Sequence, residues 1–175
     1  MSERARAAVR TFAGSAVGLG ILGALALATG QPWLFPSLGP TVMLHVERPQ
    51  DPSSAPRNTL IGHAVALLAG YGLLAATGLA DTPSVLQVGV STERIIAAAG
   101  SVAVTALVLI LLDANHAPAG ATTLLVSLGL LRTPTQLLVV AAAVALLTML
   151  DWLFNRATGR PMPAWRSRTG GDRDD

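Results

Sequence analysis

Four long, predominantly apolar windows constrain this chain more than any other feature of its sequence. They cover residues 9–29, 58–80, 95–112 and 136–154. A helix rises about 1.5 Å per residue, so each window is about long enough to cross a hydrocarbon core of about 30 Å. The windows predict an all-α membrane protein that crosses the bilayer several times.

The composition agrees with a membrane protein and disfavours a soluble domain. Of the 175 residues, 51% are hydrophobic and 13% are charged, whereas a soluble domain carries about a quarter charged residues. The chain contains no cysteine, so neither a disulfide scaffold nor thiol chemistry is available. The first apolar window is longer than the roughly 7 to 15 residues of a signal-peptide core, so we expect a retained helix.

All twelve basic residues are arginines, and eight of them lie near the two ends of the chain. The positive-inside rule predicts this distribution for cytoplasmic termini. We therefore expect an integral protein of a bacterial-type inner membrane, with cytoplasmic tails at residues 1–8 and 156–175, the second of them disordered. Nucleic-acid binding is not expected, because no groove-reading or stacking motif accompanies the charge.

Two shorter segments lie between the long windows and resemble each other. Residues 39–44 have the sequence GPTVML and residues 120–125 have the sequence GATTLL, 81 positions apart. Each follows a proline and precedes a proline-containing turn and a long apolar window. The matching order predicts two internal repeats, residues 9–80 and 93–155, within one transmembrane domain of residues 9–155.

Prolines and polar residues interrupt both short segments, which predicts half-helices at residues 39–46 and 119–131. Non-helical backbone at membrane depth survives only inside protein or beside a water-filled cavity. The amino end of a helix has unpaired N–H groups and a partial positive charge, so two such ends that converge near the midplane form an anion site. Discontinuous helices at matching places in two repeats are also typical of the substrate site of a transporter.

The symmetry of the repeats depends on whether the short segments cross the membrane or only re-enter it. Crossing places ten arginines on the cytoplasmic side and two outside, whereas re-entry gives nine and three. Three crossings per repeat make the two repeats inverted, so that the half-helices approach one centre from opposite leaflets. We expect the inverted arrangement, with re-entry as the alternative.

The amino ends of the half-helices supply the expected substrate-binding residues: Ser37, Gly39, Thr41, His116, Pro118, Gly120 and Thr122. His116 stands out among them, because an imidazole near the midplane is costly without a partner and often marks an ion or proton pathway. The alternative for His116 is helix capping or a structural hydrogen bond to a nearby carbonyl.

A second group of residues is a candidate gate or proton relay: Arg57, Asn58, His63, Asp113 and Asn115. Asp113 could pair with His116 or with an arginine, and the alternative is an interfacial residue at a helix end. Arg57 is either an anion gate or a headgroup anchor, and His63 is either part of the pathway or a packing residue. No function is predicted for His45. Three histidines without matched ligands predict no metal site, and no cofactor is expected.

Two stretches of the chain, HAPAGATTLL at residues 116–125 and APRNTLIGH at residues 55–63, resemble the characteristic stretches of the HPP family of integral membrane proteins. The resemblance covers residues 10–155, with Ala117 in place of the first proline of the histidine–proline–proline motif. Members of this family are described with four transmembrane helices, and some are linked to nitrite transport. The resemblance therefore implies a transporter of a small inorganic anion, with nitrite as the leading substrate.

Two other functional classes stay open. Small-residue stripes such as Gly14 and Gly18 allow close helix packing, and they also suit a non-transporting scaffold or partner subunit that forms a homo-oligomer. A membrane-embedded hydrolase is disfavoured, because serine, histidine and acidic residues show no recognisable catalytic spacing. We therefore expect no enzymatic activity and no catalytic residue, with the lipid bilayer and a small anion as the partners.

Overall fold

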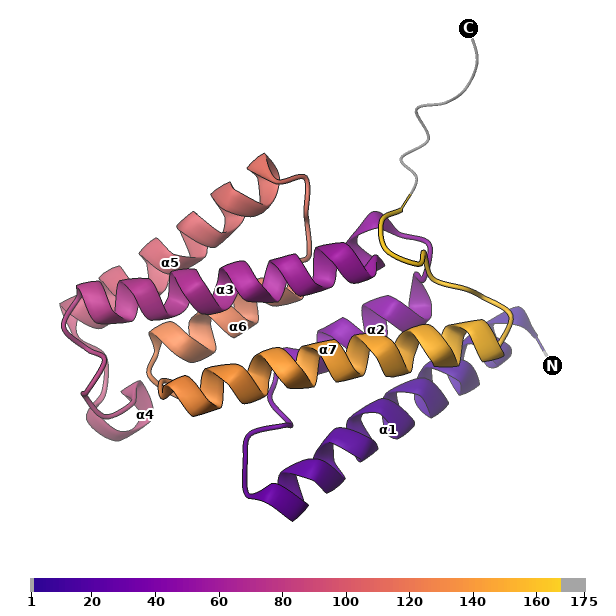
Figure 1. Cartoon of the computed structure of the whole chain (residues 1–175), viewed down its shortest axis with the longest axis horizontal. Helices are drawn as coiled ribbons and strands as arrows, with labels where there is room; N and C mark the ends of the chain where they lie inside the picture. Colours follow the sequence, from indigo (N-terminus) through magenta and orange to yellow (C-terminus); the bar gives the residue numbers. More distant parts are fainter. Residues whose placement is uncertain (1, 168–175) are drawn as a thin grey trace, which may run out of the picture.

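The fold contains four long helices and two short ones, in the order long, short, long within each half of the chain (Figure 1). The computed structural model describes residues 2–167, and within this part of the chain every regular element is helical. The long helices are apolar enough to span a membrane: α1 (Glu3–Thr29), α3 (Pro56–Ala76), α5 (Thr92–Leu111) and α7 (Pro134–Ala157). The predicted all-α polytopic fold is therefore confirmed.

The short helices have ten residues each and follow breaks in the chain. They are α2 (Leu38–Glu47) and α6 (Pro118–Ser127). A 3-10 turn, η1 (Pro52–Ser54), follows α2, and the one-turn helix α4 (Val85–Val88) joins the two halves. The half-helices expected at residues 39–46 and 119–131 are thus both present, and the sequence did not indicate η1 or α4.

Helix α6 ends at Ser127, four residues before its predicted end, although the apolar run continues. Gly129 adopts a φ of 75°, a left-handed conformation that glycine tolerates and that ends a helix. The guanidinium of Arg94, near the start of α5, donates to the carbonyl oxygen of Ser127 at 3.3 Å. Hydropathy alone placed this end too late, because it does not register backbone conformation.

The short segments continue through the molecule instead of turning back. In Figure 1, α2 runs opposite to α1 and α3, and α6 runs opposite to α5 and α7. A pair of equivalent contacts agrees with these directions. Arg10 near the start of α1 donates to the carbonyl oxygen of Val46 near the end of α2 at 2.7 Å, as Arg94 does for Ser127 at the end of α6. Each short helix therefore ends beside the start of the long helix that precedes it.

Each short helix packs between one long helix of its own half and one long helix of the other half. Helix α2 contacts α1 and α7, whereas α6 contacts α5 and α3. Exchanging the two halves converts the first set of contacts into the second. This pattern, together with the opposite directions of the halves, is that of inverted repeats whose third helices are exchanged.

Glycines allow the helices to approach closely. A Cβ atom at Gly14 of α1 would lie 2.9 Å from side-chain atoms of Phe154 and Val46. A Cβ atom at Gly70 of α3 would lie 2.9 Å from the backbone oxygen of Thr123 in α6. The small-residue stripes therefore pack against neighbouring helices of the same chain.

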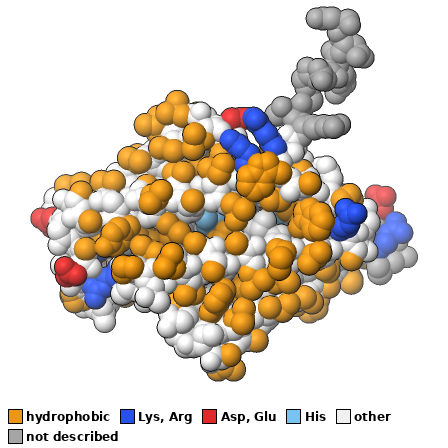
Figure 2. Space-filling view, in the orientation of Figure 1, with side chains coloured by type: hydrophobic (Ala, Val, Ile, Leu, Met, Phe, Trp, Pro, Cys, Tyr) orange, Lys and Arg blue, Asp and Glu red, His pale blue; other side chains and the backbone are white. Residues whose placement is uncertain are grey.

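The surface that surrounds this core is apolar. Figure 2 shows a face covered largely by hydrophobic side chains, with the charged side chains gathered toward its edges. Large hydrophobic residues such as Leu27, Leu68 and Leu138 are at least 72% exposed. Such a surface is suited to lipid and not to water.

The segment after α7 folds back over the end of the bundle that holds the start of α1. Met162 is buried, the N–H of Arg57 donates to the carbonyl oxygen of Trp165 at 3.0 Å, and Arg166 pairs with Asp113 at 2.8 Å. Of the tail that the sequence predicted as disordered, residues 156–157 continue α7. Met162, Trp165 and Arg166 make the contacts given above, which come from distant parts of the chain and leave no local pattern in the sequence. Residues 168–175 lie outside the described residues. The expected tail at residues 1–8 belongs to α1 from Glu3 onward.

Candidate functional site

Buried polar side chains form a connected group where the two short helices meet α3 and α7. All three histidines belong to it: His45 from α2, His63 from α3 and His116 from the connector before α6, each no more than 1% exposed. The ring centroid of His116 lies 5.0 Å from that of His63 and 6.1 Å from that of His45. Histidine atoms are visible in a recess of the hydrophobic face in Figure 2.

His63 joins the two short helices to each other. The hydroxyl of Thr41 donates to the carbonyl oxygen of Ser37 at 2.9 Å, so its oxygen accepts from Nε2 of His63 at 3.3 Å. Nδ1 then carries no hydrogen and accepts from the hydroxyl of Thr122 at 2.8 Å. Thr41 and Thr122 occupy matching positions in the two repeats, 81 residues apart. A neutral His63 with both nitrogens engaged therefore holds the amino ends of α2 and α6 together.

His45 forms a buried pair with Asp151 that the sequence analysis did not anticipate. Its Nδ1 lies 2.7 Å from Oδ2 of Asp151, and its Nε2 lies 2.9 Å from the hydroxyl oxygen of Thr59. Gly18 on α1 lies against this part of α7, because a Cβ atom there would lie 3.0 Å from Leu147 and 3.4 Å from Asp151. An acidic residue inside an apolar window needs a buried partner, and that feature of the window could have led to Asp151.

His116 differs from the other two histidines in its hydrogen bonds. Its Nδ1 lies 2.8 Å from the carbonyl oxygen of Ser53, which can only accept, so Nδ1 carries the hydrogen. The hydroxyl oxygen of Thr59 lies 3.5 Å from the same nitrogen. Nε2 of His116 is buried and has no hydrogen-bond partner within the described part of the chain. A neutral His116 therefore presents an unused lone pair at Nε2.

A cavity of about 440 Å³ lies beside His116, between α5 and the start of α6. Its walls are mostly apolar side chains of α5, and its polar side chains are those of Thr105, Asn115 and His116. Within residues 2–167, no arginine or acidic residue lines it. Gly120 contributes to the wall, and there is open space where its Cβ atom would be. The size and the few polar groups are those of a small-molecule site, which spans about 300–1,000 Å³.

The amino ends of the two short helices meet, but polar side chains occupy the space between them. The hydroxyl oxygens of Ser37 and Thr122 are 2.7 Å apart, and both residues are buried. In α6, Pro118 has no N–H, and the next two N–H groups donate to the carbonyl oxygens of residues 116 and 117 at 3.0 and 3.1 Å. The cavity therefore lies beside the second half-helix and not between the two. Of the seven expected binding residues, His116 and Gly120 line it.

Arg57 and Asn58, two candidate gate residues, hold the connector that precedes α6. The guanidinium of Arg57 donates to the carbonyl oxygens of Leu112 and Asp113 at 3.0 and 2.9 Å, and to Oδ1 of Asn58 at 3.0 Å. The side-chain amide of Asn58 donates to the carbonyl oxygen of Pro52 at 3.0 Å. Arg57 thus caps the carboxyl end of α5, where a cation is favoured.

The other members of that group lie in different surroundings. Asp113 pairs with Arg166 on the surface and has a φ of 46°, which turns the chain after α5. Asn115 is exposed and lines the cavity, and His63 lies between the half-helices as described above. Gly39 lines no wall of this cavity.

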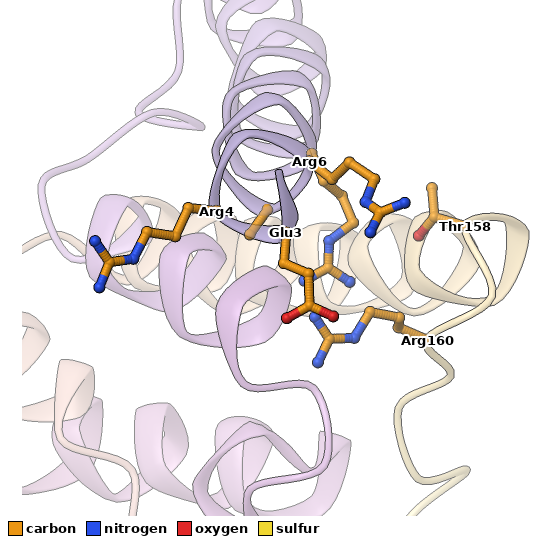
Figure 3. Close-up of a pocket in the computed structure, with 7 residues that line it drawn as sticks. Glu3, Arg4, Arg6, Thr158 and Arg160 are labelled. Atoms are coloured by element: carbon orange, nitrogen blue, oxygen red, sulfur yellow. The ribbon is translucent and has the colours of Figure 1, made fainter. Parts of the chain in front are cut away.

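A second cavity, of about 600 Å³, lies at the end of the bundle where α1 begins and α7 ends. Figure 3 shows Glu3 and Arg6 of α1 near Thr158 and Arg160, which follow α7, with Arg4 extending away from them. Arg10 also lines it. The cavity is rich in arginine and contains no member of the histidine group.

Comparison with known proteins identifies the family. A family model described as the transmembrane region of HPP proteins matches residues 2–163. No curated protein and no solved structure matches the chain. The match includes all the membrane helices, the connector that carries His116 and the cavity beside it. The chain therefore belongs to the HPP family of membrane proteins.

Proposed function

We propose that the protein transports a small monovalent anion, with nitrite as the leading substrate, and that the anion binds in the cavity beside His116. Two observations carry the proposal: His116 lines this cavity, and its buried Nε2 has no hydrogen-bond partner within the described part of the chain. A buried polar atom without a hydrogen bond costs about 1–3 kcal/mol. A ligand that bonds to Nε2 removes this cost.

The lining favours a small ligand with few polar atoms. Thr105 and Asn115 add a hydroxyl and an amide to the imidazole, and the remaining walls are apolar. The hydroxyl oxygens of Thr105 and Thr123 are 3.0 Å apart, and the hydroxyl of Thr123 donates to the carbonyl oxygen of Ala119. These hydrogen bonds hold the side chain of Thr105 in place. Nitrite, nitrate and formate fit this chemistry better than hydrated cations, which need several oxygen ligands.

The arrangement of the helices supports transport over a static scaffold. Inverted repeats are common in secondary transporters, where rocking of one part against another exposes the substrate site to alternate sides. Here α1, α2 and α7 form one group and α5, α6 and α3 form the other. His63 lies where these groups adjoin, and the cavity lies within the second group, between α5 and α6.

The experiment is uptake by vesicles that contain only this chain. Labelled nitrite should accumulate, and nitrate and formate should compete with it. A flux of potassium or ammonium that ignores added nitrite contradicts the proposal. Folded, membrane-inserted protein that moves no solute supports the alternative, a scaffold or partner subunit.

A matched pair of glycine variants tests whether the cavity holds the substrate. Gly120→Leu places a side chain in the open space of the cavity wall without a backbone clash. Gly20→Leu places the same side chain on the exposed face of α1, where space is also open. Overfilling a site costs about 1–3 kcal/mol, which is about five- to 150-fold in rate. We expect that loss for Gly120→Leu and no change for Gly20→Leu.

A further inference from the structure

We infer that each anion crosses the membrane together with one proton, so that transport is electroneutral. This inference rests on the proposed function and adds the coupling ion to it. Three observations carry it: the tautomer of His116, the absence of charged side chains from the cavity lining, and the groups that surround the ring.

The tautomer of His116 determines how its ring can form a hydrogen bond with an anion. Because Nδ1 donates a hydrogen bond to the carbonyl oxygen of Ser53 at 2.8 Å, the neutral ring has a lone pair at Nε2. An anion cannot accept a hydrogen bond from a lone pair. Either Nε2 gains a proton and donates to the anion, or the ligand arrives as the neutral acid and donates to Nε2. Both complexes contain the same atoms, one imidazole, one proton and one anion.

The cavity lining requires the loaded site to be neutral. Among residues 2–167, no arginine lines the cavity and the chain contains no lysine, so no permanent cation of the described residues balances a bound anion. Burying an unbalanced charge in a protein interior is expensive, and the usual outcome is protonation. The proton on Nε2 supplies the missing charge when the anion binds, and it departs when the anion departs.

The groups that face His116 place no fixed positive charge beside the proton. On α3, His63 has both nitrogens bonded to threonine hydroxyls, and on α2, His45 is bonded to Asp151 of α7. Thr59 lies between His45 and His116, at 2.9 and 3.5 Å from their nitrogens. Asp151 is the acidic residue of this group, and it reaches His116 only through His45 and Thr59.

The arginines at the nearest end of the bundle are bound to other groups and do not contact the ring of His116. The guanidinium of Arg57 is engaged by carbonyl oxygens of the connector, and Arg166 is paired with Asp113. Helices α5 and α6 contribute only uncharged side chains to the cavity. The site can therefore accept a proton and an anion together.

The test measures protons and nitrite in the same vesicles. A pH-sensitive dye is enclosed, a chosen membrane potential is imposed with potassium and valinomycin, and labelled nitrite is added. Because nitrous acid crosses lipid unaided, vesicles without protein and vesicles with Gly120→Leu supply the background. We expect one proton to enter per nitrite, at a rate that is the same with and without an imposed potential.

The outcomes separate this inference from the proposed function. Nitrite uptake that leaves the interior pH unchanged and follows the imposed potential overturns the inference and leaves anion transport intact. Absence of nitrite uptake by folded protein overturns both. These measurements use the unaltered protein and do not depend on any variant.

The variant His116→Gln then locates the proton. Glutamine keeps a hydrogen-bonding side chain but does not titrate. In folded protein, checked by gel filtration, we expect uptake at least tenfold slower and without proton entry. A His116→Gln protein that still carries one proton per nitrite at the original rate shows that the proton binds elsewhere, which overturns the assignment to His116.

Discussion

Among the buried histidines, hydrogen-bond partners separate structural from ligand-binding roles. His63 uses both ring nitrogens to join Thr41 and Thr122, and His45 uses both to join Asp151 and Thr59. Satisfied buried polar groups stabilise a unique packing, and an unsatisfied one is costly. His116, which lines a cavity and has one unused nitrogen, is therefore the histidine suited to a ligand.

The pH dependence of uptake should depend on His116. A proton on its Nε2 adds a positive charge beside the bound anion, so uptake should rise as the pH falls from about 8 to about 5.5. His116→Gln should flatten this profile. The measurement is the initial rate of nitrite uptake per folded protein, with a constant pH difference across the membrane. An unaltered profile in the variant excludes this histidine from the mechanism.

Removal of the Asp151 carboxylate should destabilise the protein. Asp151→Ala leaves Nδ1 of His45 buried without a partner, and breaking a buried pair in this way costs about 3–5 kcal/mol. Asp151→Asn keeps a side chain of the same shape that can still form the hydrogen bond, so its loss should be smaller. Thermal unfolding in detergent compares the two variants. Equal Tm values for Asp151→Ala and the unaltered protein contradict a structural pair.

At the scale of the elements, the two short helices depend on the glycines of the long helices that cover them. Gly70 lies where α3 meets the backbone of α6. Gly62 lies against His116, because a Cβ atom added at Gly62 would lie 2.9 Å from the Cβ atom of His116. Backbone atoms cannot move aside as a flexible side chain can. The position of α6, and of the cavity at its start, is therefore sensitive to added volume on α3.

Two glycines on α3 form a matched pair for testing this packing. A Cβ atom at Gly70 meets the backbone oxygen of Thr123 at 2.9 Å, whereas one at Gly72 meets nothing within 4 Å. Overpacking costs about 1–3 kcal/mol, so Gly70→Ala should lower the unfolding temperature and reduce transport. Gly72→Ala should leave both unchanged or raise stability slightly, because alanine favours helix. Equal unfolding temperatures for the two variants contradict the close approach of α3 and α6.

At the scale of the whole molecule, both described termini and the segment after α2 lie at one end of the bundle. Arg10 bonds to Val46, and Arg57 bonds to Trp165. The arginine-rich cavity of Figure 3 lies at the same end. Arginine concentrates on the cytoplasmic side of membrane proteins, so we propose that this end faces the cytoplasm.

Cysteine labelling tests this orientation, because the chain has no cysteine of its own. Gln50→Cys should react only with reagents on the cytoplasmic side, and Asp81→Cys, in the turn after α3, only with reagents outside. Both positions are exposed. Labelling of Gln50→Cys from the outer side alone means that α2 re-enters instead of crossing, and it contradicts the inverted arrangement of the repeats.

The sequence by itself determined the features that arise from local patterns. Apolar windows of sufficient length specify membrane helices wherever they fold, because lipid leaves the backbone no alternative to internal hydrogen bonds. Pro36, Pro40 and Pro118 interrupt two segments of the chain, which predicted both half-helices. The same order of long and short segments in the two halves predicted the repeats. Within the site, these patterns identified His116 and Gly120 and placed the break beside them.

Only the tertiary structure decided what the polar residues do. Ser37 meets Thr122 across 85 residues and His45 meets Asp151 across 106, and no local pattern encodes such pairs. Packing of α5 against α6 also determines that the cavity lies beside one half-helix, and the carbonyl oxygen of Ser53 determines which nitrogen of His116 is free. Hydrogen bonding inside a membrane protein depends on which helices face each other, and distant parts of the chain decide that.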